Sequence, residues 1–375
     1  MFALKVRTAP TGYQMIESLE VKNFRCFENL QLNGLRRINI VVGPNASGKT
    51  ALLEGILLGA RATPQAALVI NQSRNLPTPP TSLQVGVQIA LPIAPTVFSS
   101  IWDNLFFFSD SRRAVHIKYY DSQSRSFSLK IAYSSEQIIA PQQGIAGTSP
   151  GLAPTVVPIL FTRDSQAEHT VLRATLNAQN QITYEAATDL GPASAIFPSV
   201  LAYSAQDNAL WFSQLSEQGR EKEVNEILQR EFEYLGDLSV LSPHGIPALY
   251  ASVGGTAKLP VTLISTGIHK FITLILASIS YKDGIVLVDE VENGMYFDRL
   301  PALWTVLHRL AVENNSQIFV STHSRECLGA SLPIIKEDPG AFALIQMGRN
   351  GRGCSARIFS GYDFMKALEQ DAEVR

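Results

Sequence analysis

One glycine-rich loop near the N-terminus restricts the fold of this chain more than any other feature of its sequence. The loop matches the pattern GxxxxGK[ST], which is typical of loops that hold the phosphates of a nucleotide. Its residues are Gly43, Pro44, Asn45, Ala46, Ser47, Gly48, Lys49 and Thr50. The β-branched stretch Arg37–Val42 predicts a buried strand before the loop, and apolar residues at helical spacing predict a helix from the loop to about Ala60. A strand, a loop and a helix in this order favour a phosphate site in an α/β fold over a chance match.

The residue types in the loop suit a nucleoside triphosphate. Glycines allow backbone N–H groups to turn inward around a phosphate, and the N-terminus of the following helix adds a partial positive charge. In such loops the lysine, here Lys49, reaches the β- and γ-phosphates, and the threonine, here Thr50, offers its hydroxyl to Mg²⁺. We therefore expect ATP and Mg²⁺ to bind at this loop.

A second strand carries the acidic residues that such a site needs. The apolar stretch Gly284–Val288 is followed directly by Asp289 and Glu290. Both carboxylates are therefore expected at the carboxyl edge of a buried strand, where ligands bind in open α/β sheets. Asp289 would hold Mg²⁺ through water, and Glu290 would take a proton from the attacking water. The alternative is an ordinary strand that ends in a solvated acidic turn.

Two weaker patterns complete the candidate site. His323 follows the expected strand Gln317–Ser321 and lies one βαβ unit after Glu290. A contact with the γ-phosphate is therefore favoured over a purely structural histidine. Ser265 and Gly267 precede a predicted helix, and they form either a second anion-binding helix start or a plain N-cap. The residues alone leave this last choice open.

The rest of the chain is predicted to form short strands and helices, with one long surface loop at 140–158. Strands are expected at Ile16–Val21, Glu28–Leu32, Leu83–Leu91, Val115–Tyr120, Ser126–Tyr133, His169–Leu176, Gln181–Ala186, Val261–Ile264 and Ala341–Gln346. Helices are expected at Glu217–Leu235, Gly267–Ile279 and Pro301–Val312. Because strands alternate with helices after residue 280, we predict βαβ units and a parallel sheet there.

Composition argues against several other classes of protein. Hydrophobic residues make up 46% of the 375 residues, which is enough for a sizeable core. The net charge of −2 excludes a basic coat over the whole surface, although it leaves a local basic face open. Three cysteines without a CxxC pair argue against zinc and fit a reducing, cytoplasmic compartment. We expect no membrane span, because no run of 18 apolar residues occurs, and we expect residues 1–14 to be a loose tail.

The order of these motifs resembles that of ABC-type ATPases, and more narrowly of their RecF, SMC and OLD (overcoming lysogenisation defect) branch. Residues 16–32 look like the opening of that branch, with the letters IESLEVKNFRCFENLQL. Residues 288–296 read VDEVENGMY and are similar to the DExENGxH run of OLD-like ATPases, and residues 322–327 read THSREC and are similar to their THSxEC run. The resemblance covers roughly residues 15–60 and 200–375 of the chain.

The resemblance implies a fold and a division of the chain. The fold would be an α/β P-loop ATPase head with a mixed sheet, an antiparallel β-region and a helical arm. Residues 15–375 would form a single head, with a nucleotide-binding core at 15–60 and 255–375, a β-rich insertion at 62–200 and the helical arm at 205–250. The head would stand alone, because too few residues follow His323 for the TOPRIM nuclease domain of full-length OLD enzymes.

The same resemblance implies roles for the motif residues. Lys49, Glu290 and His323 would be catalytic, with His323 sensing the γ-phosphate, and Thr50 and Asp289 would serve Mg²⁺. Two head-to-tail subunits would enclose two ATP molecules. The signature that acts in trans would consist of Ser265 and Gly267, and the D-loop at the dimer interface would consist of Glu292, Asn293 and Gly294.

Three departures from the family pattern weaken parts of this assignment. The signature reads Ile-Ser-Thr-Gly at 264–267 in place of the usual LSGG run, and Met295-Tyr296 stands where related chains carry Leu-His. No Q-loop glutamine can be assigned, with Gln72 and Gln88 as the candidates. Activation in trans is the role most affected by these differences.

We expect an ATP-hydrolysing switch that dimerises around ATP and acts on a separate effector protein, a nuclease or a toxin. Such a switch would serve nucleic-acid processing, DNA repair or anti-phage defence, and an isolated monomer would hydrolyse ATP slowly. The alternative is a non-hydrolysing, ATP-dependent scaffold or a DNA-repair clamp without a toxic effector. The energising subunit of a transporter is the least favoured class, since the LSGGQ run is missing.

Two basic clusters leave contact with nucleic acid open. Both could pair with phosphates, or they could be the solvated charges found on any soluble protein. The first cluster, around an expected hairpin, consists of Arg112, Arg113, Lys118, Arg125 and Lys130, and the second, near Gly351, consists of Arg349, Arg352 and Arg357.

Overall fold

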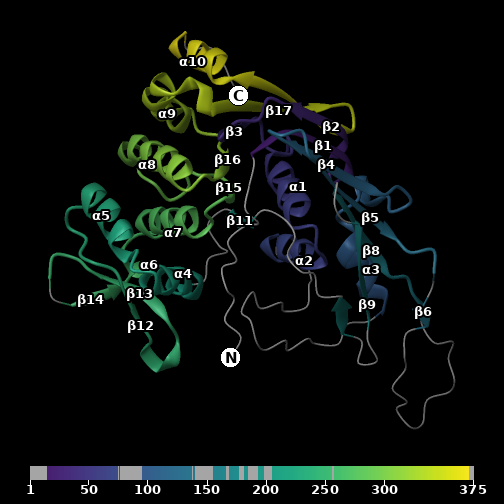
Figure 1. Cartoon of the computed structure of the whole chain (residues 1–375), viewed down its shortest axis with the longest axis horizontal. Helices are drawn as coiled ribbons and strands as arrows, with labels where there is room; N and C mark the ends of the chain where they lie inside the picture. The colour runs from purple at the N-terminus through teal and green to yellow at the C-terminus, as the bar shows by residue number, and fades with distance from the viewer. Residues whose placement is uncertain are drawn as a thin grey trace.

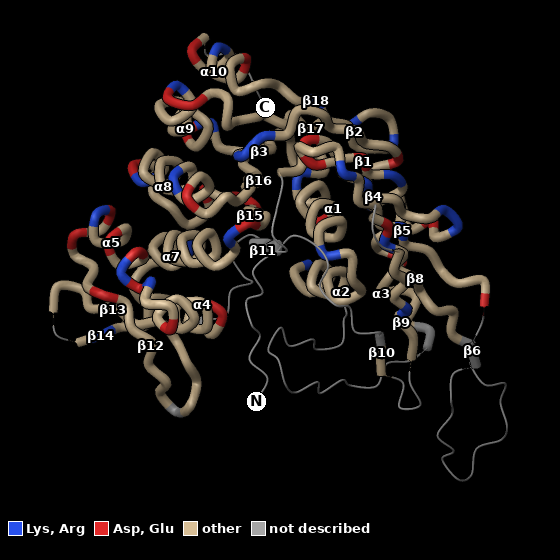
Figure 2. The backbone as a smooth tube through the Cα atoms, in the orientation of Figure 1, with Lys and Arg blue, Asp and Glu red and all other residues tan. Residues whose placement is uncertain are grey.

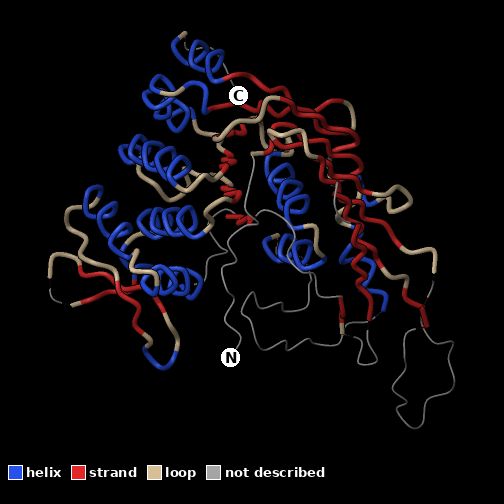
Figure 3. The backbone as a smooth tube through the Cα atoms, viewed as in Figure 1, coloured by secondary structure: helices blue, strands red, loops and turns tan. Residues whose placement is uncertain are grey.

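In the computed structural model, two β-sheets pack on either side of helix α1 (Lys49–Arg61), as Figure 1 shows. Further helices cover the outer face of one of the sheets, and Figure 3 shows this separation of helices and strands. The structure describes residues 15–74, 76, 95–136, 138–139, 155–165, 169–176, 181–184, 193–197, 205–255 and 257–370. The expected strand Leu83–Leu91, residues 1–14 and most of the expected loop 140–158 lie outside these residues.

The first sheet is mixed and carries the phosphate loop. Its strands in spatial order are β11 (Ala193–Phe197), β15 (Gly284–Val288), β16 (Gln317–Ser321), β3 (Ile38–Val42), β17 (Phe342–Asn350) and β18 (Gly353–Ser360). All neighbours are parallel except β18, which pairs with β17 in the antiparallel sense. Parallel strands bring their carboxyl ends to one edge, so the loop after β3 and the residues after β15 and β16 lie together.

Both faces of the central strands β15, β16 and β3 are buried, which explains why these strands are mostly apolar. Residues on one face, such as Val41 and Leu287, pack into the cluster that contains α1. Residues on the other face, such as Ile40 and Val288, pack against the outer helices. These outer helices are α7 (Thr266–Ser280), α8 (Leu300–Glu313), α9 (Arg325–Glu337) and α10 (Gly361–Glu369).

The second sheet is antiparallel and covers the opposite side of α1. Its strands in spatial order are β10 (Ile182–Tyr184), β9 (His169–Leu176), β8 (Ile159–Ser165), β5 (Ser126–Tyr133), β4 (Val115–Asp121), β1 (Ile16–Phe24) and β2 (Phe27–Asn33). Helices α2 (Pro64–Ser73) and α3 (Pro95–Asp103) pack into the same core, and α3 contributes Trp102 to it. The N-terminal strands β1 and β2 therefore share a sheet with strands from the 62–200 region, while β11 of that region joins the first sheet.

A helical region completes the molecule beside α7 in Figure 1. Its helices are α4 (Ala205–Glu217), α5 (Glu221–Glu231) and α6 (Val261–Ile264), and its small sheet consists of β12 (Ser239–Leu241), β13 (Ala248–Ser252) and β14 (Lys258–Pro260). The remaining elements are the pair β6 (Ile138–Ile139) and β7 (Thr155–Val156) and the short 3₁₀ turns η1 (Phe107–Ser109), η2 (Pro243–Gly245), η3 (Phe297–Arg299) and η4 (Pro339–Ala341).

The predicted fold is confirmed: an α/β head with a mixed sheet, an antiparallel β-region and a helical arm. The expected strands Gly284–Val288, Gln317–Ser321, Ser126–Tyr133 and His169–Leu176 have the observed bounds. These strands carry long β-branched or alternating patterns, which short-range sequence reading recognises well.

Three predictions were wrong. The expected surface loop 140–158 does not extend to its predicted end, because Thr155–Val156 pair with β6 as strand β7 and Val156 is buried. The expected helix Glu217–Leu235 is shorter: α5 spans Glu221–Glu231, and Gly219 with φ +70° separates it from α4, which ends at Glu217. The stretch Val261–Ile264 is the helical turn α6 rather than a strand. Its β-branched residues favour a strand, but Pro260 with φ −54° starts a helical turn that buries Val261 against α7 and leaves Leu263 exposed.

Charged residues of both signs are mixed along the fold (Figure 2), as expected for a net charge near zero. Figure 2 shows Lys and Arg interspersed with Asp and Glu along the backbone, so no face of a single sign appears in that view. Within the part of the chain that the structure describes, no helix combines the length and the apolar character that a membrane span requires.

Candidate functional site

The phosphate loop between β3 and α1 has the backbone of an anion-binding nest. Gly43, Ala46 and Gly48 have positive φ angles of 143°, 60° and 96°, which turn successive N–H groups toward one side. A Cβ atom at position 43 would lie 2.4 Å from the backbone oxygen of Met347, so β17 leaves room only for glycine there. The tight fit of the loop against the sheet explains two of the glycines in the motif.

Lys49 begins α1, and its buried side chain curls back over the loop. Its Nζ donates to the backbone oxygens of Gly43 at 2.7 Å and Pro44 at 3.1 Å. Burial lowers the pKa of this ammonium group, and the carboxylates that follow β15 act in the opposite direction. Beside it, the buried Oγ of Ser47 has no hydrogen-bond partner. A buried polar atom without a partner is costly, so the loop fits a ligand that offers acceptor oxygens.

Asp289, which follows β15, is held by two hydroxyl groups from other strands and helices. Oγ1 of Thr50 donates to its Oδ2 at 2.7 Å, and Oγ of Ser321 donates to its Oδ1. The carboxylate and the threonine hydroxyl are hard oxygen ligands, as Mg²⁺ prefers. Among the described residues no group of three or more His, Cys, Asp and Glu side chains forms a metal site. Mg²⁺ is commonly held by one or two protein oxygens and by substrate phosphates, so these two residues fit it.

Glu290 has a backbone conformation that only its surroundings sustain. Its φ of +47° lies in the left-handed region, which is unfavourable for a residue with a side chain. Three contacts hold it: its N–H donates to Oγ of Ser321 at 2.8 Å, Nζ of Lys270 donates to its carbonyl at 2.5 Å, and Nδ2 of Asn293 donates to its Oε2. The hydrogen bond from Asn293 holds the carboxylate in one orientation.

Lys270 is a site residue that sequence reasoning missed. It lies in the first turns of α7, and burial lowers the pKa of its ammonium group to about 8. Nothing in the local sequence marks it, because its carbonyl partner Glu290 belongs to another element. The contact joins the start of α7 to the end of β15.

His323 lies after β16 and contacts the segment that follows Glu290. Its Nδ1 lies 3.2 Å from Oε1 of Glu292, and its backbone N–H donates to the same oxygen at 3.0 Å. The His323 side chain is half exposed, whereas Glu292 is nearly buried. The expected sensor histidine is therefore in direct contact with the expected D-loop.

Ser265 and Gly267 lie at the start of α7. Ser265 occupies the N-cap position, but its side chain makes no capping hydrogen bond, which argues against the plain N-cap interpretation. A Cβ atom at position 267 would lie 2.5 Å from the backbone oxygen of Gly294. Glycine is therefore required at 267 by close approach of the 292–294 segment.

The structure thus brings four of the predicted residues, Thr50, Asp289, Glu290 and Asn293, into one connected group. Hydrogen bonds run from Thr50 through Asp289 and Ser321 to Glu290 and Asn293. The two candidates for a Q-loop glutamine do not join it: Gln72 lies within helix α2 rather than in a loop, and Gln88 lies outside the described residues.

Two family models match overlapping parts of the chain, each of them slightly less than half of it. The first, described as "AAA ATPase domain", matches residues 15–189. The second, described as "AAA domain, putative AbiEii toxin, Type IV TA system", matches residues 160–328. Together they span the phosphate loop, the acidic strand end and His323.

The chain is also similar to parts or the whole of several individual proteins. The chain is similar to an ATP/GTP phosphatase of Helicobacter pylori, with 22% identity over 86% of this chain and 89% of that protein. It is 47% identical to the DNA replication and repair protein RecF of Listeria welshimeri over 12% of this chain and 13% of that protein. An SMC head domain from Pyrococcus furiosus, bound to the C-terminal domain of ScpA, aligns with a TM-score of 0.49 at 11% identity, over 95% of this chain and 99% of that chain.

Proposed function

We propose that this chain uses ATP and Mg²⁺ to close into a dimer, and that the dimer controls a separate effector protein. The premise is that the chain is an ABC-type ATPase of the RecF, SMC and OLD type. The observation that carries this proposal is the connected group from Thr50 to Asn293, which joins a metal-binding pair to a fixed carboxylate. Such a group suits phosphoryl transfer to water, where positioning and charge neutralisation supply most of the rate.

Each residue has a defined task in this proposal. Lys49 leaves its carbonyl partners to bind the β- and γ-phosphates, and Thr50 and Asp289 hold Mg²⁺, which would neutralise charge on the phosphates. Glu290 accepts the proton of the attacking water. Asn293 orients its carboxylate through the Nδ2–Oε2 hydrogen bond, and His323 contacts the γ-phosphate.

An exposed apolar surface beside the signature and the D-loop supports closure with a second copy. Leu263 is 74% exposed, and Tyr296 and Phe297 are 67% and 61% exposed. Large apolar side chains at this level of exposure are typical of interaction surfaces. Ser265 and Gly267 of one copy would complete the site of the other, so an isolated copy would hydrolyse ATP slowly.

The description of the second family model bears on the effector and on the biological setting. The second family model carries the words "Type IV TA system", and this supports a nuclease or toxin partner in defence. The alternative is a non-hydrolysing scaffold or a DNA-repair clamp, which the departures from the LSGG signature favour. In either case we treat residues 15–375 as one head that acts in the cytoplasm.

The decisive experiment is light scattering coupled to size exclusion on Glu290→Gln, with and without Mg-ATP. The substitution removes the proposed base but leaves the ATP site in place, so it should trap the closed state. Addition of ATP should then convert the monomer to a dimer or make an existing oligomer more compact. Lys49→Ala is the matched control, and it should show no response to ATP. If Glu290→Gln binds ATP with unchanged mass and shape, activation in trans is wrong.

Steady-state turnover separates the switch from the scaffold. The switch requires that Glu290→Gln loses most of the ATPase activity of the unmodified chain. Equal turnover of the two proteins would support the scaffold.

A further inference from the structure

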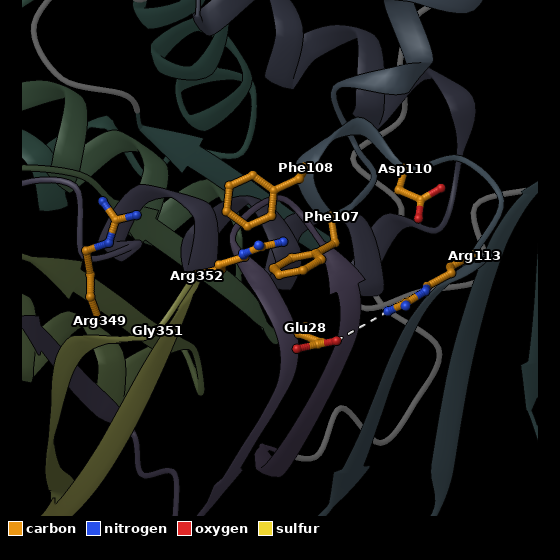
Figure 4. A pocket seen from close by; sticks show the side chains of 8 residues that line it. All are labelled: Glu28, Phe107, Phe108, Asp110, Arg113, Arg349, Gly351 and Arg352. Carbon is orange, nitrogen blue, oxygen red and sulfur yellow. Dashed lines mark hydrogen bonds and ion pairs between the residues drawn. The ribbon is translucent and has the colours of Figure 1, made fainter.

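The structure brings together arginines that lie far apart in the sequence. Arg113 precedes β4, whereas Arg349 and Arg352 lie where β17 turns into β18. All three line one pocket of about 890 Å³, and Phe107 and Phe108 form another part of its wall (Figure 4). The volume lies in the range of pockets that bind small molecules or parts of larger ligands.

The charges in this pocket are only partly compensated. Arg113 pairs with Glu28 at 3.2 Å. Arg349 and Arg352 are exposed, and the described part of the chain supplies no hydrogen bond or ion pair to either guanidinium. Two unpaired guanidinium groups lining one pocket favour an anion that offers two oxygens to each planar guanidinium, such as a phosphate.

The aromatic wall is exposed and held in place. Phe108 is 60% exposed, and its ring stands at 76° to that of Phe107 with centroids 4.6 Å apart. Its φ of +46° is unfavourable for a bulky residue, yet its N–H donates to the carbonyl of Arg25 at 3.2 Å and keeps the turn in that shape. An apolar ring fixed in solvent beside unpaired arginines indicates a stacking partner that also carries negative charge.

Backbone contacts link the pocket to the phosphate loop, since the N–H of Phe108 donates to the carbonyl of Arg25 in the turn between β1 and β2. The turn between β1 and β2 contains Arg25 and Cys26, and the carbonyl of Cys26 accepts a hydrogen bond from the N–H of Cys354 at 2.8 Å. Cys354 in turn lies against the loop, with its Sγ 3.8 Å from the carbonyl of Ala46. A ligand in the pocket would therefore press on the same turn that supports the nucleotide site.

We propose that this pocket binds one nucleotide of a single-stranded nucleic acid, with its base stacked on Phe108 and its flanking phosphates paired with Arg349 and Arg352. Aromatic platforms next to basic side chains are the usual means of holding single strands. A duplex keeps its bases stacked inside, so it offers no free base to Phe108. DNA and RNA share the required chemistry, and the experiment distinguishes them. This proposal does not depend on ATP hydrolysis or on dimerisation.

The test is fluorescence anisotropy with labelled oligothymidylate, labelled oligouridylate and a mixed-sequence duplex, on the full chain at low salt. The single strands should bind more tightly than the duplex. Phe108→Ala should weaken single-strand binding about tenfold or more, because base stacking contributes strongly to such sites. Replacing Arg349 and Arg352 by alanine should reduce the slope of log K against log salt by about 0.7 for each lost phosphate contact.

Two further variants make the test sharp. Arg112→Ala is the matched control, because Arg112 is next to the pocket but already pairs with Asp110 at 2.6 Å. It should leave binding unchanged. Phe108→Tyr should retain binding, since it keeps the aromatic face at an exposed position.

Three outcomes would overturn the proposal. One is that the unmodified chain binds neither single strand, and another is that Arg112→Ala and Phe108→Ala weaken binding equally. The third is that Phe108→Ala leaves strand binding intact but weakens binding of a fluorescent ATP analogue, which would make the base of ATP the occupant. Failure of the ATP switch is recognised separately, by the mass of Glu290→Gln with Mg-ATP.

Discussion

Gly267 at the start of α7 gives the most demanding test of how the site is built. A Cβ atom at this position would lie 2.5 Å from the backbone oxygen of Gly294 and 3.5 Å from Cα of Met295. Ordinary contact begins near 3.4 Å, so the substitution Gly267→Ala must separate α7 from the 292–294 segment by about 0.9 Å. The obstacle is backbone rather than a flexible side chain, so it cannot rotate away.

Two opposing terms decide the effect of Gly267→Ala on stability. Overpacking of this kind costs about 1–3 kcal/mol. Alanine in place of glycine favours a helix by up to about 1 kcal/mol, and by less in the first turn. We therefore expect the free energy of unfolding to fall by about 0.5–2 kcal/mol, measured by denaturant titration.

The effect on turnover should be larger than the effect on stability. Asn293 lies in the displaced segment and orients the carboxylate of Glu290, so a shift of this size moves the proposed base. Misplacement of a reacting group by about 1 Å can cost about 100-fold in rate. We expect ATP turnover of Gly267→Ala to fall at least about tenfold, with ATP binding little changed.

Gly329 offers a control with the same substitution and the opposite sign. It lies inside α9 and is exposed, and a Cβ atom there would meet no atom within 4 Å. Gly329→Ala should raise the free energy of unfolding by about 0.5–1 kcal/mol and leave turnover unchanged. The reasoning fails if Gly267→Ala matches Gly329→Ala in both stability and turnover.

Two further predictions concern buried charges. Burial lowers the pKa of Lys270 from 10.5 to about 8, so between these values the unfolded chain binds the proton and the folded chain does not. The free energy of unfolding of the native chain, measured relative to Lys270→Met, should therefore rise by about 3 kcal/mol between pH 8 and 10.5, and a flat difference would refute this. Glu54 is buried in α1 and pairs with Arg25 at 3.3 Å and Arg74 at 2.6 Å. Glu54→Ala should destabilise the fold by about 3–5 kcal/mol, because Arg25 would be left buried without its counter-charge. Denaturant titration measures this loss, and a loss below about 1 kcal/mol would show that these ion pairs are unimportant for stability.

The phosphate loop, the acidic strand end and the strand before His323 could be predicted from sequence because each is a local pattern. A run of five apolar residues must be buried, and glycines at fixed spacing must turn. The neighbouring positions of β15 and β16 also follow from the sequence, since one crossover helix of the expected length separates them, whereas the place of β3 beside β16 does not. Errors arose where local preference was overruled, as in Val261–Ile264, where packing against α7 outweighs the β-branched composition.

Only the tertiary structure decided how these pieces act together. Thr50 and Asp289 are 239 positions apart, and no short-range pattern reports their contact. The left-handed backbone of Glu290 exists only because Ser321 and Lys270 hold it from two other elements. The sequence alone determined which chemical groups are available to this chain, because residue types and local periodicity can be read directly from it. Which side chains meet depends on long-range packing, and packing exists only in the folded chain.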